Sequence, residues 1–365
     1  MKKIGILTFH CAHNYGAVLQ CYALQETLKK MGHDVEVIDY RPQYLLSPYA
    51  VFNINRIKSN NPLKIIKRSI RETILLGVRL KRYYTFYQFI KNKLSLSSRI
   101  TKYNIPESYD VYIMGSDQIW NPKITEGFDP VYFGNFNFQK GSKKYISYAA
   151  SMEANELNNQ AKNTYKKFLK NFDSISVREN QLAELLQPLS EKNIETVLDP
   201  TLLADNQIWD NIAQKPDISK KYVFVYQIRA NDNTLRIANQ VAKQIGADVI
   251  EVAAWHSLKF DKNKFQCKSP ESFLGLIKYA SCIITTSFHG TAFSIIFNRP
   301  FYCIKLNDGS DTRSISLLTS VGLENRMIEN KCTPVFSMID FKNANNKISK
   351  LRNSSLEFLS TALKS

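Results

Sequence analysis

Residues 4–40 read IGILTFHCAHNYGAVLQCYALQETLKKMGHDVEVIDY, and this stretch already contains the order of elements from which a fold can be predicted. The apolar run 4–8 has the length of one buried strand, and the loop after it ends in a glycine. A helix is expected over 17–31, closed by Gly32 where helices favour glycine. A second strand is expected over 35–40. Strand, helix and strand in this order predict a parallel, doubly wound sheet.

The same alternation of strands and helices continues along the chain. Further short apolar runs predict strands at 111–114, 145–149, 174–177, 195–198, 222–228, 248–252, 282–286 and 301–304. A polar stretch before the strand at 222 divides them into two groups, which is typical of a domain boundary. The expected fold is therefore α/β with two Rossmann-like domains, 1–212 and 213–340, each built on a parallel sheet. A terminal helix within 341–365 is expected to pack back near their junction.

The composition is that of an ordinary globular protein, with 44% hydrophobic and 22% charged residues, which excludes a disordered or fibrous chain. No apolar run approaches the ~18 residues that a membrane-spanning helix needs. The apolar run near the N-terminus is too short for a signal-peptide core, so a cytoplasmic protein is expected. The six cysteines stand singly, without a C-x-x-C pair or a histidine at zinc spacing. Reduced structural thiols, and no metal site, are expected.

Positive charge is concentrated in one segment. Of the formal net charge of +17, a contribution of +12 lies between Arg56 and Lys102, where 13 cations face Glu72 alone. Apolar residues recur there at helical spacing, which predicts a basic helical insertion at about 54–103, pictured as a helical pair. Two interpretations of the aromatic run 83–89 stay open: core packing against the sheet, or a surface for anionic lipid or a lipid-linked acceptor. Charge alone also allows nucleic-acid binding, but no motif of that class accompanies it, so nucleic acid is not an expected partner.

Ligands of open α/β sheets bind beyond the carboxyl ends of the strands, so the loops there hold the candidate site residues. The most informative loop follows the strand 282–286 and leaves His289 at the N-terminus of a helix opened by Gly290 and Thr291. Free backbone N–H groups at such an end attract an anion, and the imidazole beside it can act as acid or base. A purely local capping role for His289 is the alternative.

Two other loops carry polar side chains. The first contains His10, His13 and Asn14 between a strand and Gly16, more hydrogen-bonding groups than a simple connection requires. The second contains Asp117, which is either a general base or the cap of a helix beginning near Gln118.

Five short motifs occur in a recognisable order. They are Asn14-Tyr15-Gly16-Ala17, Gly115-Ser116-Asp117-Gln118-Ile119-Trp120, Ser176-Val177-Arg178-Glu179, Asp199-Pro200-Thr201 and Ser287-Phe288-His289-Gly290. With these motifs the chain resembles the polysaccharide pyruvyl transferase family from about residue 4 to 330. The resemblance implies a fold of the GT-B type and transfer of pyruvate from phosphoenolpyruvate to a sugar as a cyclic ketal. The acceptor would be a polysaccharide sugar or its lipid-linked precursor, met in the cytoplasm or at the inner face of the membrane.

The resemblance also assigns roles to residues. The family's motif arginine falls on Arg178 and its motif histidine on His289, while Ser287 replaces a second family arginine. Arg313 is our own candidate for the missing cation. Phosphoenolpyruvate carries a carboxylate and a phosphate, which guanidinium and N–H donors bind well. His289 suits the general acid, and Asp117 or His10 the base. The remaining predicted substrate-binding residues are Asn14, Tyr15, Gly16, Gly290 and Thr291.

No resident cofactor is expected, because phosphoenolpyruvate is the donor substrate. The main alternative is a sugar-nucleotide glycosyltransferase, which shares the two-domain architecture. A basic nucleic-acid-binding protein is the second alternative.

Overall fold

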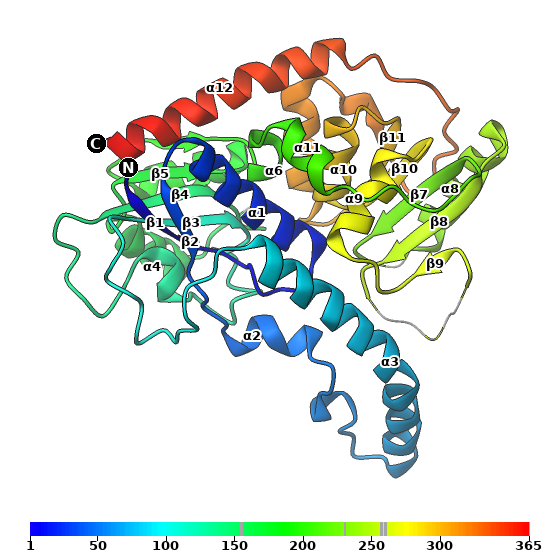
Figure 1. The fold of residues 1–365 in the computed structure, drawn as a ribbon, viewed down its shortest axis with the longest axis horizontal. Coiled ribbons are helices and arrows are strands. Elements are labelled where there is room, and N and C mark those ends of the chain that lie inside the picture. The colour runs from blue at the N-terminus through cyan, green and yellow to red at the C-terminus, as the bar shows by residue number, and fades with distance from the viewer. Residues whose placement is uncertain (154–155, 230, 256–257, 259–260, 365) are drawn as a thin grey trace.

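Two parallel sheets form the body of the protein (Figure 1). The computed structural model describes residues 1–153, 156–229, 231–255, 258 and 261–364. Both sheets have six strands, and all strand pairs within them are parallel. The predicted α/β fold with two Rossmann-like halves is therefore confirmed.

The first sheet is built from the N-terminal half of the chain. Across the sheet its strands are β2 (Asp34–Val37), β1 (Lys3–Leu7), β3 (Val111–Asp117), β4 (Lys144–Ala150), β5 (Ser174–Val177) and β6 (Ile194–Thr196). Its helices are α1 (Tyr15–Lys30), α2 (Gln43–Leu46), α4 (Asn159–Leu169) and α5 (Asn180–Leu186). The central strands are buried on both faces, which explains their nearly continuous apolar sequences.

The second sheet repeats the arrangement. Its strands are β12 (Met327–Ile328), β11 (Phe301–Ile304), β10 (Cys282–Thr285), β7 (Tyr222–Gln227), β8 (Asp248–Ala253) and β9 (Lys264–Phe265). Its helices are α8 (Asp232–Ile245), α9 (Pro270–Lys278), α10 (Phe288–Ile296) and α11 (Asp311–Val321). The short helices α6 (Pro200–Leu203) and α7 (Asn206–Ile212) connect the halves. The exact domain limit at 212 stays a prediction.

Contacts between the halves are extensive. Tyr15 at the start of α1 stacks on Phe273 of α9 with ring centroids 4.3 Å apart, and both side chains are buried. The C-terminal helix α12 (Lys342–Lys364) runs back along the top of the view in Figure 1. It packs against α11 in one half and against α6 and β4 in the other. Ser355 on this helix accepts a hydrogen bond of 3.0 Å from the backbone N–H of Leu198. The two halves therefore share one continuous core.

The basic insertion differs from the expected helical pair, because it forms one long helix, α3 (Pro62–Lys93). Asn61 caps this helix, and Pro62 occupies the first turn, where no backbone donor is lost. In Figure 1 the N-terminal end of α3 projects away from the body. Among the described residues, no helix is both long and apolar enough to cross a membrane.

The buried face of α3 was also predicted incorrectly. The residues buried on this helix are Glu72, Leu75, Arg79, Arg82, Phe86, Phe89 and Ile90. By contrast, the apolar residues whose spacing suggested the packing face are at least half exposed; they are Leu63, Ile66, Ile70 and Ile74. Arginines replace apolar residues on the true packing face because they find acceptors there: Arg82 donates to the carbonyls of His13 and Ala253. Of the aromatic run, Phe86 and Phe89 join the core, whereas its tyrosines stay exposed.

Candidate active site

A cavity of about 400 Å³ lies where loops from both halves meet, and it is called the interdomain cavity below. Asn14 and Asp117 line it from the first half, and Ser287, His289 and Arg313 line it from the second. These residues follow β1, β3, β10 and β11, so the carboxyl ends of both sheets face the same space. The cavity therefore brings together five of the predicted site residues.

His289 is the second residue of α10, directly after the buried strand β10. Its side chain is almost fully buried, and its Nε2 lies 3.8 Å from Oδ2 of Asp199. Among the described residues, Nε2 has no hydrogen-bond partner. Burial lowers the pKa of His289 below its ordinary value, although the Asp199 carboxylate acts in the opposite direction. The free protein thus holds a neutral imidazole with an unsatisfied ring nitrogen beside the cavity.

The His289 ring packs directly on the backbone of Gly16 in the first turn of α1. A Cβ atom at this position would lie 2.0 Å from Nδ1 of His289, far inside van der Waals contact. Only glycine leaves room for the ring, which gives a physical reason for the glycine of the Asn-Tyr-Gly motif. Gly16 and His289 belong to different halves of the protein. The placement of the imidazole therefore depends on how the halves are packed.

An ionic network lies beneath His289. Arg178, which follows β5, donates 2.8 and 2.9 Å hydrogen bonds to Asp199 and Glu179, and another of 2.9 Å to Ser151. Asp199 also caps α6 by accepting from the backbone N–H of Thr201 at 2.9 Å. Burial alone would raise the pKa of Asp199, but the neighbouring His289 and Arg178 hold it below its ordinary value. The structure places Arg178 behind the cavity wall, where it orients Asp199 toward His289.

Arg313 supplies positive charge on the cavity side. Its side chain is buried, and its nearest carboxylate is Glu153, with 3.6 Å between Nη2 and Oε1. Within the described residues its Nε has no hydrogen-bond partner. Burial and the nearby Arg178 lower the pKa of Arg313, yet a guanidinium remains charged at physiological pH. A buried guanidinium with a free donor is an anion-binding feature.

The N-terminus of α10 adds further donors. Ser287 caps this helix, and its Oγ accepts from the backbone N–H of Gly290 at 3.4 Å, while Thr291 donates back to the Ser287 carbonyl. The N–H of Gly290 is therefore engaged within the helix, contrary to the expectation that it binds an anion. In the part of the chain that the structure describes, the N–H groups of Phe288 and His289 have no acceptor. They leave the helix end open toward the cavity.

Asp117 ends β3 with a left-handed φ of 74°. No helix begins at Gln118, so the predicted helix-capping role is wrong; the carboxylate instead accepts from the N–H of Gln118 at 2.9 Å within a turn. The conformation suits an aspartate, whose short side chain tolerates positive φ. It directs residue 117 to the cavity wall, where the side chain remains available to a ligand.

His10 and Tyr15 lie away from the cavity lining, and Asn14 has a local role as well. His10 is fully buried and contacts Asp39 through Nε2 at 2.9 Å and the Thr8 carbonyl through Nδ1 at 3.3 Å. Tyr15 donates to the Lys268 carbonyl at 2.8 Å within the shared core. Asn14 lines the cavity but also caps α1 through Gly16 and Ala17. Local structure thus engages these side chains, and a substrate contact by His10 or Tyr15 stays a prediction.

Several residues at the site were not among the predicted site residues. Glu153, Lys123 and Arg229 line the interdomain cavity, and Asp199 lies under the histidine. They come from irregular loops, whose spatial position depends on the fold around them. Only Asp199 belonged to a recognisable motif. Among the described residues, no group of three or more His, Cys, Asp or Glu side chains could hold a metal ion.

Comparison with known proteins agrees with this geometry. The family model described as polysaccharide pyruvyl transferase matches residues 14–308. The chain belongs to the polysaccharide pyruvyl transferase family, as the resemblance predicted. It is accordingly a transferase of polysaccharide synthesis with a sugar-containing acceptor. A search of curated protein sequences gives no match.

Three solved structures are similar to this chain over most of its length. The glycosyltransferase SnogD from Streptomyces nogalater has a TM-score of 0.44 at 12% identity, covering 100% of this chain and 98% of that chain. The UDP-GlcNAc 2-epimerase from Methanocaldococcus jannaschii has a TM-score of 0.45 at 12% identity, with coverage of 97% and 93%. The enzyme of that name from Neisseria meningitidis, bound to UDP-GlcNAc, has a TM-score of 0.45 at 10% identity, with coverage of 99% and 94%.

Proposed function

We propose that the protein transfers pyruvate from phosphoenolpyruvate to a sugar of a polysaccharide or its lipid-linked precursor, forming a ketal. The observation that carries this proposal is the convergence of Arg313, the open end of α10 and His289 on one cavity. Two kinds of anion donor beside a neutral imidazole suit a small substrate with a carboxylate and a phosphate. Because Ser287 leaves more space than an arginine would, Arg313 takes the place of the missing family cation.

The reaction requires three proton movements. One sugar hydroxyl loses its proton and adds to the enol carbon, while the methylene carbon takes up a proton and becomes a methyl group. A second hydroxyl then displaces phosphate from the same carbon, its proton leaves with the phosphate, and the ketal closes. We assign protonation of the methylene to His289 and removal of the hydroxyl proton to Asp117. The bound donor's negative charge would raise the pKa of His289 and so load the acid for this step.

Arg178 and His10 receive lesser roles. Arg178 holds Asp199 beside His289, so we assign it to positioning, and any contact with the donor would use its remaining N–H groups. His10 is less suited to act as base than Asp117, because both of its ring nitrogens already contact oxygen atoms. We further propose that no metal is required, since Arg313 and backbone N–H groups can stabilise the departing phosphate.

The test is incubation with labelled phosphoenolpyruvate and candidate sugar acceptors, with release of inorganic phosphate as the readout. His289→Ala should reduce turnover by about 10²- to 10⁴-fold, the range for losing a general acid, while the protein stays folded. Near-normal turnover would remove His289 from the mechanism. Activity that disappears with a chelator and returns with a divalent ion would overturn metal independence.

A sugar-nucleotide glycosyltransferase is the rival function. The two can be separated by ligand-induced thermal stabilisation, because a ligand that binds only the folded state raises the melting temperature. Stabilisation by phosphoenolpyruvate supports the proposal, whereas stabilisation by nucleotide-sugars alone supports the rival.

We also propose that α3 brings the enzyme to an anionic membrane surface from the cytoplasmic side. This helix exposes apolar side chains beside its cations, a combination that binds lipid headgroups reversibly. Each cation near an anionic leaflet contributes roughly 1 kcal/mol of binding free energy. Sedimentation with anionic vesicles should occur at low salt and fade at high salt. Glutamine at Lys64, Lys67, Arg68 and Arg71 should abolish it. A protein that ignores anionic vesicles at low salt would contradict this attachment.

A further inference from the structure

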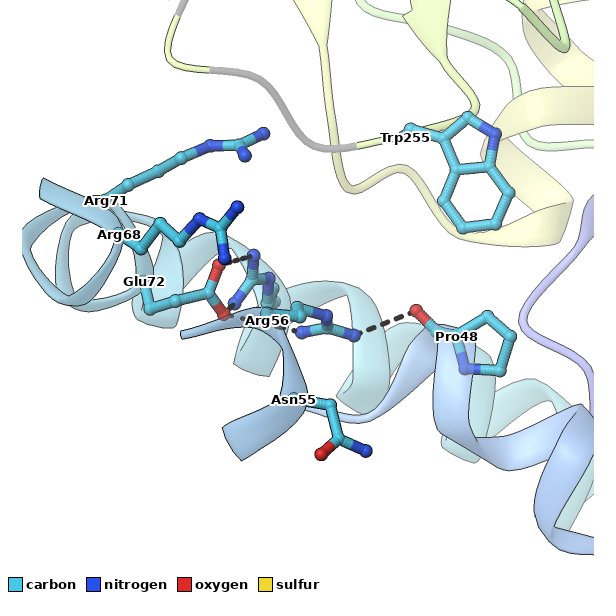
Figure 2. Close-up of a pocket in the computed structure, with 8 residues that line it drawn as sticks. Pro48, Asn55, Arg56, Arg68, Arg71, Glu72 and Trp255 are labelled. Carbon is cyan, nitrogen blue, oxygen red and sulfur yellow. Dashed lines mark hydrogen bonds and ion pairs between the residues drawn. The ribbon is translucent and has the colours of Figure 1, made fainter. Parts of the chain in front are cut away.

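A second cavity, of about 470 Å³, lies between α3 and the segment 48–56 that precedes it (Figure 2). It is called the arginine cavity, because four of its lining residues are arginines: Arg56, Arg68, Arg71 and Arg79. Glu72 is its single lining acid, and Trp255 from the second half stands across from α3. Four cations against one carboxylate leave a net charge of +3 around the cavity.

The inner arginines form a fixed base. Arg79 binds both oxygens of Glu72, at 2.8 Å for the longer contact, and both side chains are buried. Arg56 lies 3.6 Å from the same carboxylate and donates to the Pro48 carbonyl at 2.9 Å. Its Nη1 is buried and, within the described residues, has no hydrogen-bond partner. Glu72 is therefore neutralised, and the buried Nη1 of Arg56 lies at ion-pair distance from it without a hydrogen bond.

The outer arginines are exposed. Arg68 and Arg71 lie one helical turn apart on α3, and Figure 2 shows both side chains extending on the side that faces Trp255. Arg68 donates to the Lys58 carbonyl, while Arg71 has no ion pair among the described residues. Planar guanidinium groups in such a cluster match phosphate oxygens, and two neighbouring phosphates match the cluster better than one.

An apolar groove of about 390 Å³ adjoins the arginine cavity and shares Arg68 and Arg71 with it. Ile70, Ile74 and Leu258 line this groove, and they are 56%, 50% and 46% exposed. Exposed apolar side chains beside a cationic pocket suit a ligand with a charged head and a hydrocarbon chain. The two outer arginines stand at the boundary where such a head would meet its chain.

The arginine cavity also leads toward the interdomain cavity. A small hollow of about 10 Å³, no larger than one water molecule, shares Arg56, Arg79 and Trp255 with the arginine cavity, and Tyr49 lines both this hollow and the interdomain cavity. Tyr49 and Trp255 stack with ring centroids 5.6 Å apart and planes within 6°. These two rings stand between the two cavities, so a group attached to a ligand in the arginine cavity reaches His289 only when they move apart.

We propose that the arginine cavity binds the diphosphate of a prenyl-linked sugar acceptor. The prenyl chain lies in the apolar groove, and the sugar extends past Tyr49 and Trp255 toward the interdomain cavity. The diphosphate chemistry follows from the arginine cluster alone, whereas its attachment to an acceptor sugar rests on the proposed function.

Binding of three probes, measured by calorimetry at low salt without membranes, tests this assignment. The probes are inorganic pyrophosphate, farnesyl diphosphate below its micelle concentration, and uridine diphosphate. Arg68→Gln/Arg71→Gln should weaken pyrophosphate and farnesyl diphosphate by at least about tenfold, as expected for lost charge-assisted contacts. The control Lys81→Gln/Lys91→Gln removes two exposed cations from the same helix that line neither the arginine cavity nor the apolar groove. It should change binding less than about twofold.

Each outcome decides between sources of the diphosphate. Farnesyl diphosphate binding more tightly than pyrophosphate supports the prenyl-linked source, and Ile70→Ser should remove that advantage alone. Uridine diphosphate binding most tightly would make this a nucleotide site and overturn the assignment. Equal losses in the arginine and lysine variants would reduce the effect to general charge and also overturn it. Because no arm contains phosphoenolpyruvate, a negative result here is distinguishable from failure of pyruvyl transfer.

Discussion

Gly16→Ala tests whether the close packing of Gly16 on the ring of His289 holds that ring in place. The added Cβ would lie 2.0 Å from Nδ1 of His289, whereas ordinary contact begins at 3.4 Å, so the ring must move by at least 1.4 Å. A misplacement of ~1 Å at a reacting group can cost ~10²-fold in rate. Overpacking of this kind costs about 1–3 kcal/mol of stability. We therefore expect about a hundredfold loss of phosphate release and a melting temperature lower by a few degrees.

Two comparisons make the Gly16 result specific. Gly77→Ala on α3 meets no atom within 4 Å and should leave turnover unchanged while slightly stabilising the helix. In a His289→Ala background, adding alanine at position 16 should no longer reduce stability, because the clashing ring is gone. Native turnover in Gly16→Ala, or an undiminished stability loss without the imidazole, would refute the packing argument.

Three further predictions follow from the charges and burial around the site. Arg313→Gln should raise the KM for phosphoenolpyruvate about 10- to 100-fold, because a charge-assisted contact is worth ~1.5–3 kcal/mol. Arg229→Gln, on the same cavity, should have less effect, because the Arg229 side chain is 63% exposed whereas that of Arg313 is buried. Arg178→Met should lower the free energy of unfolding by about 3–5 kcal/mol in denaturant titrations, because it leaves Asp199 buried without its cation. Burial and Arg82 lower the pKa of His13 from 6.5 to about 4. The free energy of unfolding should therefore be highest above pH 6.5 and should fall by about 3 kcal/mol as the pH drops toward 4, because the buried imidazole must then take up a proton. His13→Phe, which retains the stacking on Phe86, should abolish this fall, and a pH dependence of stability that stays unchanged in the variant would contradict the assignment to His13.

The strand and helix pattern was largely predictable from the sequence. The strands expected at 174–177 and 301–304 are β5 and β11 without any shift. Buried parallel strands are short apolar runs bounded by turns, and this signal is local in the chain. The long helix α3 shows where local signal is insufficient. Its apolar spacing pointed to Ile66 and Ile70, but the packed face carries arginines that find carbonyl partners on distant segments.

The site was predictable only in part. His289, Asp117, Ser287 and Asn14 were identified because polar residues after strand ends lie at the ligand-binding edge of a parallel sheet. Arg313 was proposed instead as a replacement for the family arginine missing at Ser287. The engagement of Arg178 by Asp199 was not predictable, because Asp199 is distant in sequence and only the packing of β5 and α6 brings it beside Arg178. The same holds for Glu153, which comes from a loop without a motif.

Periodicity and motif order in the chain were enough to predict the parallel α/β architecture, the family and the choice of His289 as the candidate acid–base histidine. These features depend on neighbours in sequence, and a single chain contains them in full. The arrangement of Gly16 against His289, the carboxylate beneath the ring and the arginine cavity beside α3 required the folded protein. Each depends on segments that approach only when the two sheets pack on a shared core, and no spacing along the chain encodes that distance.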